Sequence, residues 1–368
     1  MKFIKLKIKT KSSEYPIFIG SNLISNLSKF IMMSSLEFKK CLLIIDSNVP
    51  KTTIFKITKS LNKKNLSTHY IKASEINKNL ESVKKILEIL LKNNFSRNDC
   101  LISIGGGISG DISGLAASLF KRGLKFINLP TTLLSQVDSS IGGKTGVNTK
   151  FGKNLIGSFY QPSLVVSDIN LLKTLPKREI ICGYGEILKH SLIASKTLFN
   201  FLDKNIISIL NLKSPFIEKA IFESCKIKKN LVEKDEKETN LRKTLNFGHT
   251  FAHAYEASLN YSNKLNHGEA VILGIQSALK FSIKNNFLKQ KEYTLIDNHI
   301  KKAKLPSNLG KFFKIKDYNK ILSFMSKDKK NNSEKINLIL LKKIGLPILN
   351  KEYDKEYLSL FLKEQLIY

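Results

Sequence analysis

The chain has 368 residues, with 61 Lys and Arg against 30 Asp and Glu, and its formal net charge is +31. This length is enough for two domains with substantial cores, and no apolar run approaches the roughly 18 to 20 residues of a membrane-spanning helix. The lysines are spread along the whole chain without a zinc-finger spacing, an aromatic RNA-binding stripe or a basic tail. We therefore expect neither a nucleic-acid partner nor a membrane attachment.

The N-terminus and the cysteines indicate the compartment. Residues 1–9 alternate polar and apolar side chains, which is typical of a first strand and not of a signal peptide. The four cysteines lie far apart in apolar surroundings and form no C-x-x-C pair: Cys41, Cys100, Cys182 and Cys225. Buried thiols of this kind are usual in a reducing cytosol, so we expect a cytoplasmic protein.

The first half of the chain alternates between strand and helix patterns. Residues 2–9 and 16–19 predict a hairpin, and residues 21–30 and 80–91 have helical spacing. Short apolar runs predict strands at 41–45, 100–104, 124–129 and 164–166, and a further strand is expected to end at residues 70–71. This alternation is typical of a mostly parallel sheet with helices on both faces, in which ligands bind at the carboxyl ends of the strands.

The pattern changes near residues 174–176. From there to about residue 298 nearly all the periodicity is helical, over 178–194, 197–210, 215–234, 245–260 and 268–286. A strand at 336–341 and a helix at 353–362 follow. The sequence therefore predicts a Rossmann-like α/β domain over residues 1–175 and an all-α domain over residues 176–368.

A glycine-rich stretch follows the strand predicted at 100–104. Gly105, Gly107 and Gly110 match G-x-G-x-x-G, in which backbone N–H groups and a helix N-terminus bind phosphate. The match alone is weak, because the usual acidic residue about 20 positions downstream is missing, and a tight turn without a ligand is the alternative. Further polar residues strengthen the binding hypothesis: Thr131 and Thr132, which follow a proline, and Lys144, Lys153 and Asn154, which are expected in loops.

Three of the six histidines fall close together, at positions 249, 253 and 267. His249 and His253 are four residues apart on a predicted helix and share one face. Two histidines and a carboxylate with an open position suit catalytic zinc, and Glu186 in Gly-Tyr-Gly-Glu is the candidate carboxylate. Helical spacing favours His249 and His253 as the pair, but the spacing leaves open which two histidines bind.

Seven motifs occur in order along the chain: Gly105–Asp111, 121–123, 130–148, 153–157, Glu186-x-x-Lys189, 235–242 and 245–253. Together they resemble the motifs of 3-dehydroquinate synthases, a family of sugar phosphate cyclases, over essentially the whole length. Ser74 and Ala252 depart from the pattern, since glycine is usual at both positions. The resemblance implies the dehydroquinate synthase-like fold, with an NAD-binding first domain, a metal- and substrate-binding helical domain and a homodimer.

The resemblance also implies a reaction. Members of the family convert 3-deoxy-D-arabino-heptulosonate 7-phosphate to 3-dehydroquinate and phosphate, in the shikimate route to chorismate and the aromatic amino acids. They use NAD catalytically, together with a divalent metal, zinc or cobalt.

Individual roles are implied in the same way. The resemblance implies that the metal ligands are Glu186, His249 and His267. It implies that His253 lies on the substrate side and does not bind the metal. The residues assigned to NAD are Asp46, Asn48, Glu75, Lys78, Gly106, Gly107, Asp111, Thr131, Thr132, Lys144, Lys153 and Thr174. The residues assigned to the substrate and the chemistry are Arg122, Asp138, Lys144, Lys153, Asn154, Lys189, Lys228, Arg242, Asn246 and His253; Lys329 and Lys330 are weaker candidates.

Two alternatives remain at this point. One is another enzyme of the same wider group, a polyol dehydrogenase or a cyclase that makes a different carbocycle. A dehydrogenase would need no phosphate-binding cations and would release NADH, whereas a dehydroquinate synthase releases phosphate without net NADH. The other alternative is an inactive basic interaction protein, which predicts loss of site residues that this sequence retains.

Overall fold

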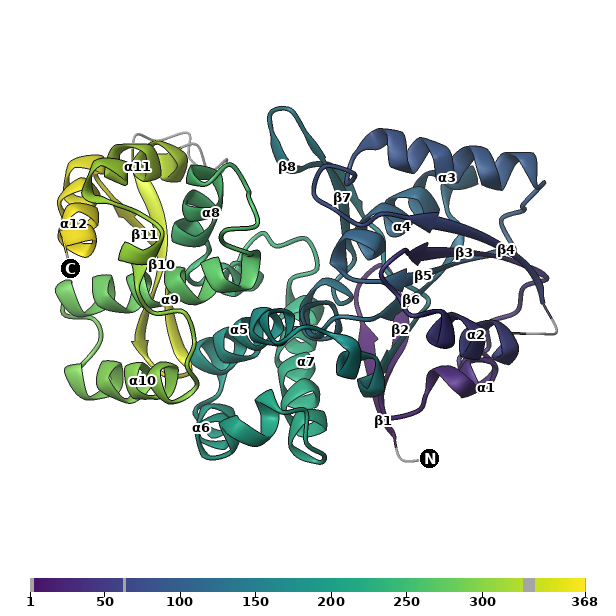
Figure 1. The fold of residues 1–368 in the computed structure, drawn as a ribbon, viewed down its shortest axis with the longest axis horizontal. Helices are drawn as coiled ribbons and strands as arrows, with labels where there is room; N and C mark the ends of the chain where they lie inside the picture. The colour runs from purple at the N-terminus through teal and green to yellow at the C-terminus, as the bar shows by residue number, and fades with distance from the viewer. Residues whose placement is uncertain (1–2, 62–63, 327–334, 368) are drawn as a thin grey trace. The chain divides into compact units, whose positions relative to one another are not determined.

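The computed structural model describes residues 3–61, 64–326 and 335–367 (Figure 1). The chain divides into two units, one of Met1–Pro176 with Ile221–Lys237 and one of Lys177–Ala220 with Glu238–Tyr368. The sequence analysis assigned every residue after 175 to the helical half. The segment Ile221–Lys237 differs from that expectation, because it belongs with the first unit.

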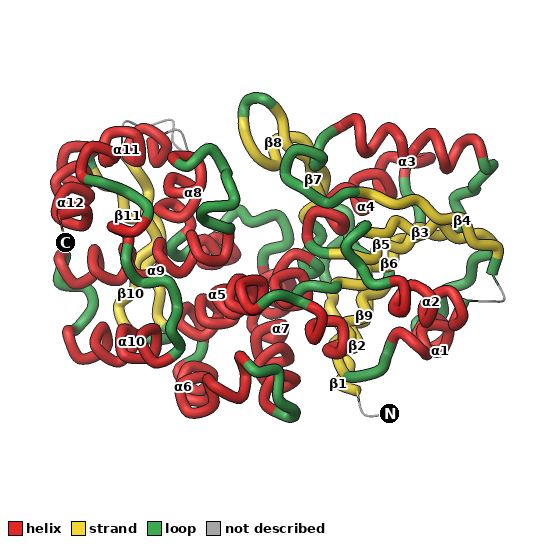
Figure 2. Tube along the Cα trace, viewed as in Figure 1, coloured by secondary structure: helices red, strands yellow, loops and turns green. Residues whose placement is uncertain are grey.

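The first unit is built on a seven-stranded sheet in the order β1-β2-β9-β6-β5-β3-β4, with its strands labelled in Figure 2. Only the β1–β2 pair is antiparallel, and the other neighbours run parallel. The strands are β1 (Phe3–Lys9), β2 (Glu14–Gly20), β3 (Lys40–Asp46), β4 (Asn65–Ile71), β5 (Cys100–Gly105), β6 (Lys125–Pro130) and β9 (Leu164–Asp168). The predicted mostly parallel sheet is confirmed.

Helices cover both faces of this sheet: α1 (Leu27–Met33), α2 (Lys51–Ser60), α3 (Leu80–Lys92) and α4 (Gly107–Leu119). Successive side chains of a strand point to opposite faces. Leu43 of β3 accordingly packs in a core with α1 and α2, whereas Leu42 and Ile44 pack in a second core with α3 and α4. Both faces are buried, which explains why β3 and β5 are nearly continuous apolar runs, with Ser103 as the polar residue inside β5.

A separate hairpin, β7 (Lys144–Thr149) and β8 (Gly152–Phe159), also belongs to the first unit. The expectation that Lys144, Lys153 and Asn154 lie in loops is therefore wrong, since Lys144 begins β7 and the other two lie in β8. The hairpin follows η3 (Ser135–Ser139), a single π-helical turn. Three 3₁₀ turns complete this part of the chain: η1 (Ile24–Asn26), η2 (Phe120–Arg122) and η4 (Ile169–Thr174).

The second unit is mainly helical (Figure 2). Its helices are α5 (Lys177–Ala194), α6 (Lys196–Leu210), α8 (His249–Ser258), α9 (His267–Lys284), α10 (Gln290–Lys302), α11 (Tyr318–Ser326) and α12 (Lys355–Ile367), and residues of α7 (Phe216–Lys234) fall in both units. It also contains one antiparallel hairpin, β10 (Ile336–Lys343) with β11 (Leu346–Tyr353), and the turns η5 (Leu241–Asn246), η6 (Leu309–Lys311) and η7 (Ile315–Asp317). Within the described ranges, no helix has the length and apolar character that a membrane span requires.

Candidate functional site

Three potential metal ligands meet in the second unit. Glu186 lies in α5, and His249 and His267 are the first residues of α8 and α9. One carboxylate oxygen and one nitrogen from each imidazole all lie within 4.8 Å of one another. His249 Nε2 is 3.6 Å from Glu186 Oε1. This is the donor set of a catalytic zinc site, and it brings together the three residues that the family resemblance implied.

His253 lies one helical turn beyond His249, and its ring centroid is 5.3 Å from that of His249. Its side chain is exposed and falls outside the three-ligand cluster among the described residues. Helical spacing alone favoured His249 with His253. The geometry instead favours His249 with His267, which comes from a different helix.

Close helix packing brings the ligands together. A Cβ at Gly268 would stand within 3.0 Å of the Cys182 Cα and carbonyl oxygen, and 2.5 Å from its Sγ, so α9 and α5 approach here as only a glycine allows. The Gly268 N–H donates to Cys182 Sγ at 3.1 Å. Gly248, with φ +80, caps α8, and a Cβ there would lie 2.7 Å from the backbone nitrogen of Ile275 in α9. The three helices thus meet at glycines beside their ligand residues.

The charged groups of this cluster are buried, and His249 beside them is neutral. Glu186 and Lys189 are 1% and 2% exposed and form an ion pair one helical turn apart. Burial, followed by the charge of Lys189, lowers the pKa of His249 well below its usual value. The imidazole is therefore neutral near pH 7, which is the form that binds metal.

Each of the two histidine ligands has a partner for Nδ1. His249 Nδ1 lies 3.3 Å from the Phe247 carbonyl oxygen, and His267 Nδ1 lies 3.0 Å from Glu256 Oε2. The sequence analysis missed Glu256. The sequence spacing could have identified it, because Glu256 follows His249 by seven residues, which places both side chains on one face of the same helix, two turns apart.

The second unit also holds two further candidates from the sequence, Arg242 and Asn246, in η5. Arg242 is 1% exposed. Arginine side chains are almost never buried this fully unless they are paired or functional. The Asn246 Nδ2 donates to Glu238 Oε1 at 2.6 Å. Lys329 and Lys330 lie outside the described residues.

The glycine turn of the first unit has the geometry of an anion-binding site. β5 ends at Gly105, Gly106 caps α4, and Thr131 and Thr132 follow the end of β6. Exposed N–H groups and the partial positive charge of a helix N-terminus favour a phosphate at such a point.

Asp46 lies beside the glycine turn, at the carboxyl end of β3. A Cβ at Gly105 would stand 3.0 Å from the Asp46 Cβ, so the turn packs directly against this residue. Asp46 Oδ1 accepts from Asn48 N at 3.0 Å and from Asn48 Nδ2 at 3.1 Å. Burial raises the pKa of Asp46, although the bonds from Asn48 and Ala73 oppose this effect.

A polar network links the β7–β8 hairpin to the turn at 74–78. The Lys78 ammonium pairs with Asp111 and donates to Asn154 Oδ1 at 2.6 Å, and Lys153 Nζ lies 3.2 Å from Glu75. Burial would raise the pKa of Glu75, but Lys153 and its other polar neighbours lower it overall. The turn forms with Ser74 at the position where glycine is usual, since the Ser74 carbonyl accepts from the N–H groups of residues 77 and 78.

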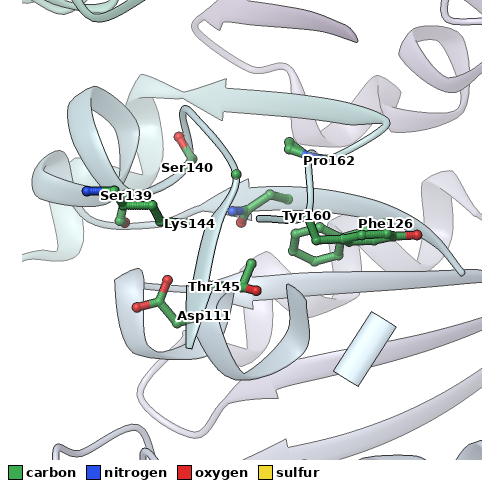
Figure 3. A pocket seen from close by; sticks show the side chains of 11 residues that line it. Asp111, Phe126, Ser139, Ser140, Lys144, Thr145, Tyr160 and Pro162 are labelled. Carbon is green, nitrogen blue, oxygen red and sulfur yellow. The ribbon is translucent and has the colours of Figure 1, made fainter. Parts of the chain in front are cut away.

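Lys228 and Asp138 form another pair of the first unit, with Lys228 Nζ 2.7 Å from Asp138 Oδ1. Asp111, Lys144 and Thr145 line a small pocket nearby (Figure 3). Its volume is about 10 Å³, the space of about one water molecule, so it is too small for a dinucleotide. Arg122 and Thr174 are exposed in short turns, and the structure does not place them in the networks described above.

Comparisons with known proteins place the chain in a family. Residues 68–182 match the model of the 3-dehydroquinate synthase N-terminal domain, and residues 183–331 match that of the C-terminal domain. The chain is 62% identical over 366 residues to the 3-dehydroquinate synthase of Pelagibacter ubique (strain HTCC1062), with 100% of both chains covered. It is 42% identical over 336 residues to that of Alkaliphilus metalliredigens (strain QYMF), with 91% of this chain and 92% of the relative covered.

Solved structures share the fold. A 2-deoxy-scyllo-inosose synthase complexed with carbaglucose-6-phosphate, NAD⁺ and Co²⁺ matches with a TM-score of 0.88 at 24% identity, over 98% of this chain and 100% of that one. The 2-epi-5-epi-valiolone synthase of Streptomyces hygroscopicus subsp. jinggangensis 5008, with NAD⁺ and Zn²⁺ bound, matches with a TM-score of 0.86 at 24% identity. This match covers 97% of this chain and 98% of that one. From the family models and the close relatives it follows that the chain belongs to the 3-dehydroquinate synthase family.

Proposed function

We propose that this member of the family converts 3-deoxy-D-arabino-heptulosonate 7-phosphate to 3-dehydroquinate and phosphate, with NAD and one zinc or cobalt ion. The observation that carries the proposal at the level of the site is the cluster of Glu186, His249 and His267. Relatives named for this activity support it, as do cyclases of the same fold that are described with NAD⁺ and Co²⁺ or Zn²⁺.

The metal would be held by Glu186, His249 and His267. One carboxylate and two imidazole nitrogens are donors that fit zinc or cobalt, and the Glu186 side chain that would supply the carboxylate is 1% exposed. When bound, such an ion supplies a Lewis acid that polarises hydroxyl and carbonyl oxygens of the substrate. Lys189 would then share Glu186 with the metal and face the substrate.

NAD would be held by the first unit, with its phosphates at the turn before α4. The cofactor supplies the oxidation of a substrate hydroxyl to a ketone and the later reduction of that ketone. The Asp46 carboxylate would accept hydrogen bonds from the ribose diol and repel a 2′-phosphate, which favours NAD over NADP. The ion pair between Lys78 and Asp111 would hold both side chains in place beside the bound cofactor.

The substrate is a sugar phosphate, and cations would position it. Lys144, Lys153 and Arg242 are proposed to hold the phosphate that leaves, with His253 and Asn246 at the remaining substrate oxygens. Fixed cations stabilise charge that develops on a leaving group far better than water does. Arg242 in particular offers a planar fork for two phosphate oxygens.

One assay tests this proposal. The enzyme is incubated with the heptulosonate phosphate and NAD⁺ while inorganic phosphate and the absorbance of NADH are followed together. We expect phosphate release without accumulation of NADH, lost with a chelator and restored by Zn²⁺ or Co²⁺. A steady rise of NADH without phosphate would instead identify a dehydrogenase and overturn the proposal.

Metal analysis of two variants tests the ligand assignment. His267→Ala should lose the metal, whereas His253→Ala should keep it at near-full occupancy and turn over poorly. The reverse pattern would show that the pair favoured by helical spacing binds instead.

We also propose that the enzyme is a cytoplasmic homodimer. Four buried cysteines that form no disulfide fit a reducing compartment. The dimer rests on the family resemblance alone, and light scattering should give twice the mass of a single chain.

A further inference from the structure

The contact between Glu256 and His267 carries an inference that rests on the proposed metal site. Glu256 lies in α8, seven residues after His249, and its side chain is 4% exposed. Its Oε2 is 3.0 Å from His267 Nδ1. A carboxylate buried this deeply is costly unless it is hydrogen-bonded to a specific partner.

Glu256 is not placed as a ligand itself. The cluster of ligand atoms within 4.8 Å contains Glu186, His249 and His267, and among the described residues Glu256 does not enter it. Glu256 therefore lies behind the His267 ring, on the side of Nδ1. An imidazole whose Nδ1–H donates to a carboxylate has its lone pair on Nε2, and the ring cannot rotate without breaking that bond.

His249 offers an internal comparison. Its Nδ1 faces the Phe247 carbonyl oxygen at 3.3 Å, and its Nε2 faces Glu186 at 3.6 Å. Both histidines thus have an oxygen beside Nδ1, but the partner of His267 is a carboxylate and the partner of His249 is a neutral carbonyl. Only the carboxylate adds negative charge, which makes the coordinating nitrogen a stronger donor.

We propose that Glu256 is a positioning residue of the metal site, which holds His267 in the tautomer with hydrogen on Nδ1 and directs Nε2 toward Glu186 and His249. Glu256 links two of the three helices that carry ligands, since it lies in α8 and His267 begins α9. The metal site consequently depends on a carboxylate that does not touch the metal.

The test measures zinc affinity directly, by competition with a coloured chelator, on the full-length protein. Glu256→Gln keeps the size of the side chain and an oxygen that can accept from Nδ1–H, but it loses the charge. Glu256→Leu removes the hydrogen bond as well. Losing such a partner typically costs 10- to 100-fold in metal affinity, so we expect about tenfold for Glu256→Gln and more for Glu256→Leu.

Glu292→Gln is the matched control. Glu292 is a carboxylate of the same unit that pairs with Lys196 at 3.0 Å and accepts from Ile344 N at 3.1 Å, and neither partner is a histidine. This variant should bind zinc within about twofold of the wild type. The absorption spectrum of the cobalt-substituted protein should change in Glu256→Leu and stay unchanged in Glu292→Gln.

Three results would overturn the inference. Both Glu256 variants could bind zinc as the wild type does, or Glu292→Gln could weaken zinc as much as they do. A fall in melting temperature without a change in zinc affinity would show that Glu256 only packs the helices. If the wild type itself binds no divalent metal, the proposed function fails too, and that result is distinct from the other three.

Discussion

Replacing Gly268 by alanine is expected to separate α9 from α5 and to disturb the metal site. The new Cβ would stand within 3.0 Å of the Cys182 Cα and carbonyl oxygen, whereas carbon atoms in good contact are about 3.5–4.0 Å apart. Because two of the nearest atoms belong to the backbone, no side-chain rotation relieves the clash. The helices must part by roughly 1 Å.

The size of the effect follows from this overlap. Overpacking in a well-packed core costs about 1–3 kcal/mol, and each kcal/mol lowers the melting temperature of a domain of this size by about 2–4 °C. A drop of roughly 2–12 °C is therefore expected by calorimetry. Zinc affinity should fall too, because metal–ligand distances tolerate only about 0.2 Å and Glu186 lies in α5, whereas His267 begins α9.

Gly310→Ala is the control for this experiment. A Cβ at Gly310 would meet only the side-chain oxygen of Asn308, at 3.1 Å, so melting and zinc binding should stay near wild type. Adding Cys182→Ala to Gly268→Ala should not restore either property, because the backbone overlap remains. Recovery in the double variant, or a Gly268→Ala protein that melts and binds zinc like the wild type, would refute the reasoning.

Three further predictions address charge. Alanine at each proposed phosphate-binding cation, Lys144, Lys153 and Arg242, should lower kcat/KM by about 10²- to 10³-fold in a protein that still folds by circular dichroism. The exposed controls Lys59→Ala and Lys311→Ala should have no effect, and equal losses in both sets would contradict the site. NADP⁺ should fail to replace NAD⁺, and Asp46→Asn should relax this preference in steady-state kinetics; equal use of both cofactors by the wild type would contradict the role of Asp46. Burial lowers the pKa of His299 despite the opposing Asp203, so its neutral form is favoured in the fold and stability should be lost as pH falls below about 6.5. The urea midpoints of unfolding at pH 7 and pH 5.5 should differ less in His299→Gln than in the wild type. An equal difference in both proteins would show that His299 does not contribute to the pH dependence of stability.

The parallel sheet could be predicted because its strands are buried on both faces. β3 and β5 are short apolar runs followed by polar or glycine residues, and this pattern can be recognised in the sequence alone. The β7–β8 hairpin could not be found in this way. Apart from Gly146, Val147 is its one fully buried position, and its Lys, Thr, Asn and Gly residues give no alternation of polar and apolar side chains. Its stability comes from contacts with distant residues, such as Asn148 N donating to the Lys78 carbonyl at 2.7 Å.

The helix α10 was overlooked for a different reason. Its apolar face is short and includes a histidine, with Ile296, His299 and Ile300 as its buried residues. His299 is buried because Tyr184 Oη lies 2.7 Å from Nε2 and Asp203 Oδ1 lies 3.0 Å from Nδ1. A residue that counts as polar in the sequence is thus a core residue, and only the tertiary partners reveal it.

The metal site shows most clearly what spacing can and cannot predict. Spacing identifies residues on one helix face, so it favours His249 with His253, but the third ligand arrives on another helix through contacts at glycines. Ala252, which stands where glycine is usual in the family, shows how tight these contacts are. A Cβ at Gly274 would lie 2.9 Å from Ala252 N and 3.2 Å from its Cβ, so the methyl group of Ala252 fits only because residue 274 has none. The departure at Ala252 is therefore compatible with close packing of α8 on α9, and with the position of His249 that this packing determines.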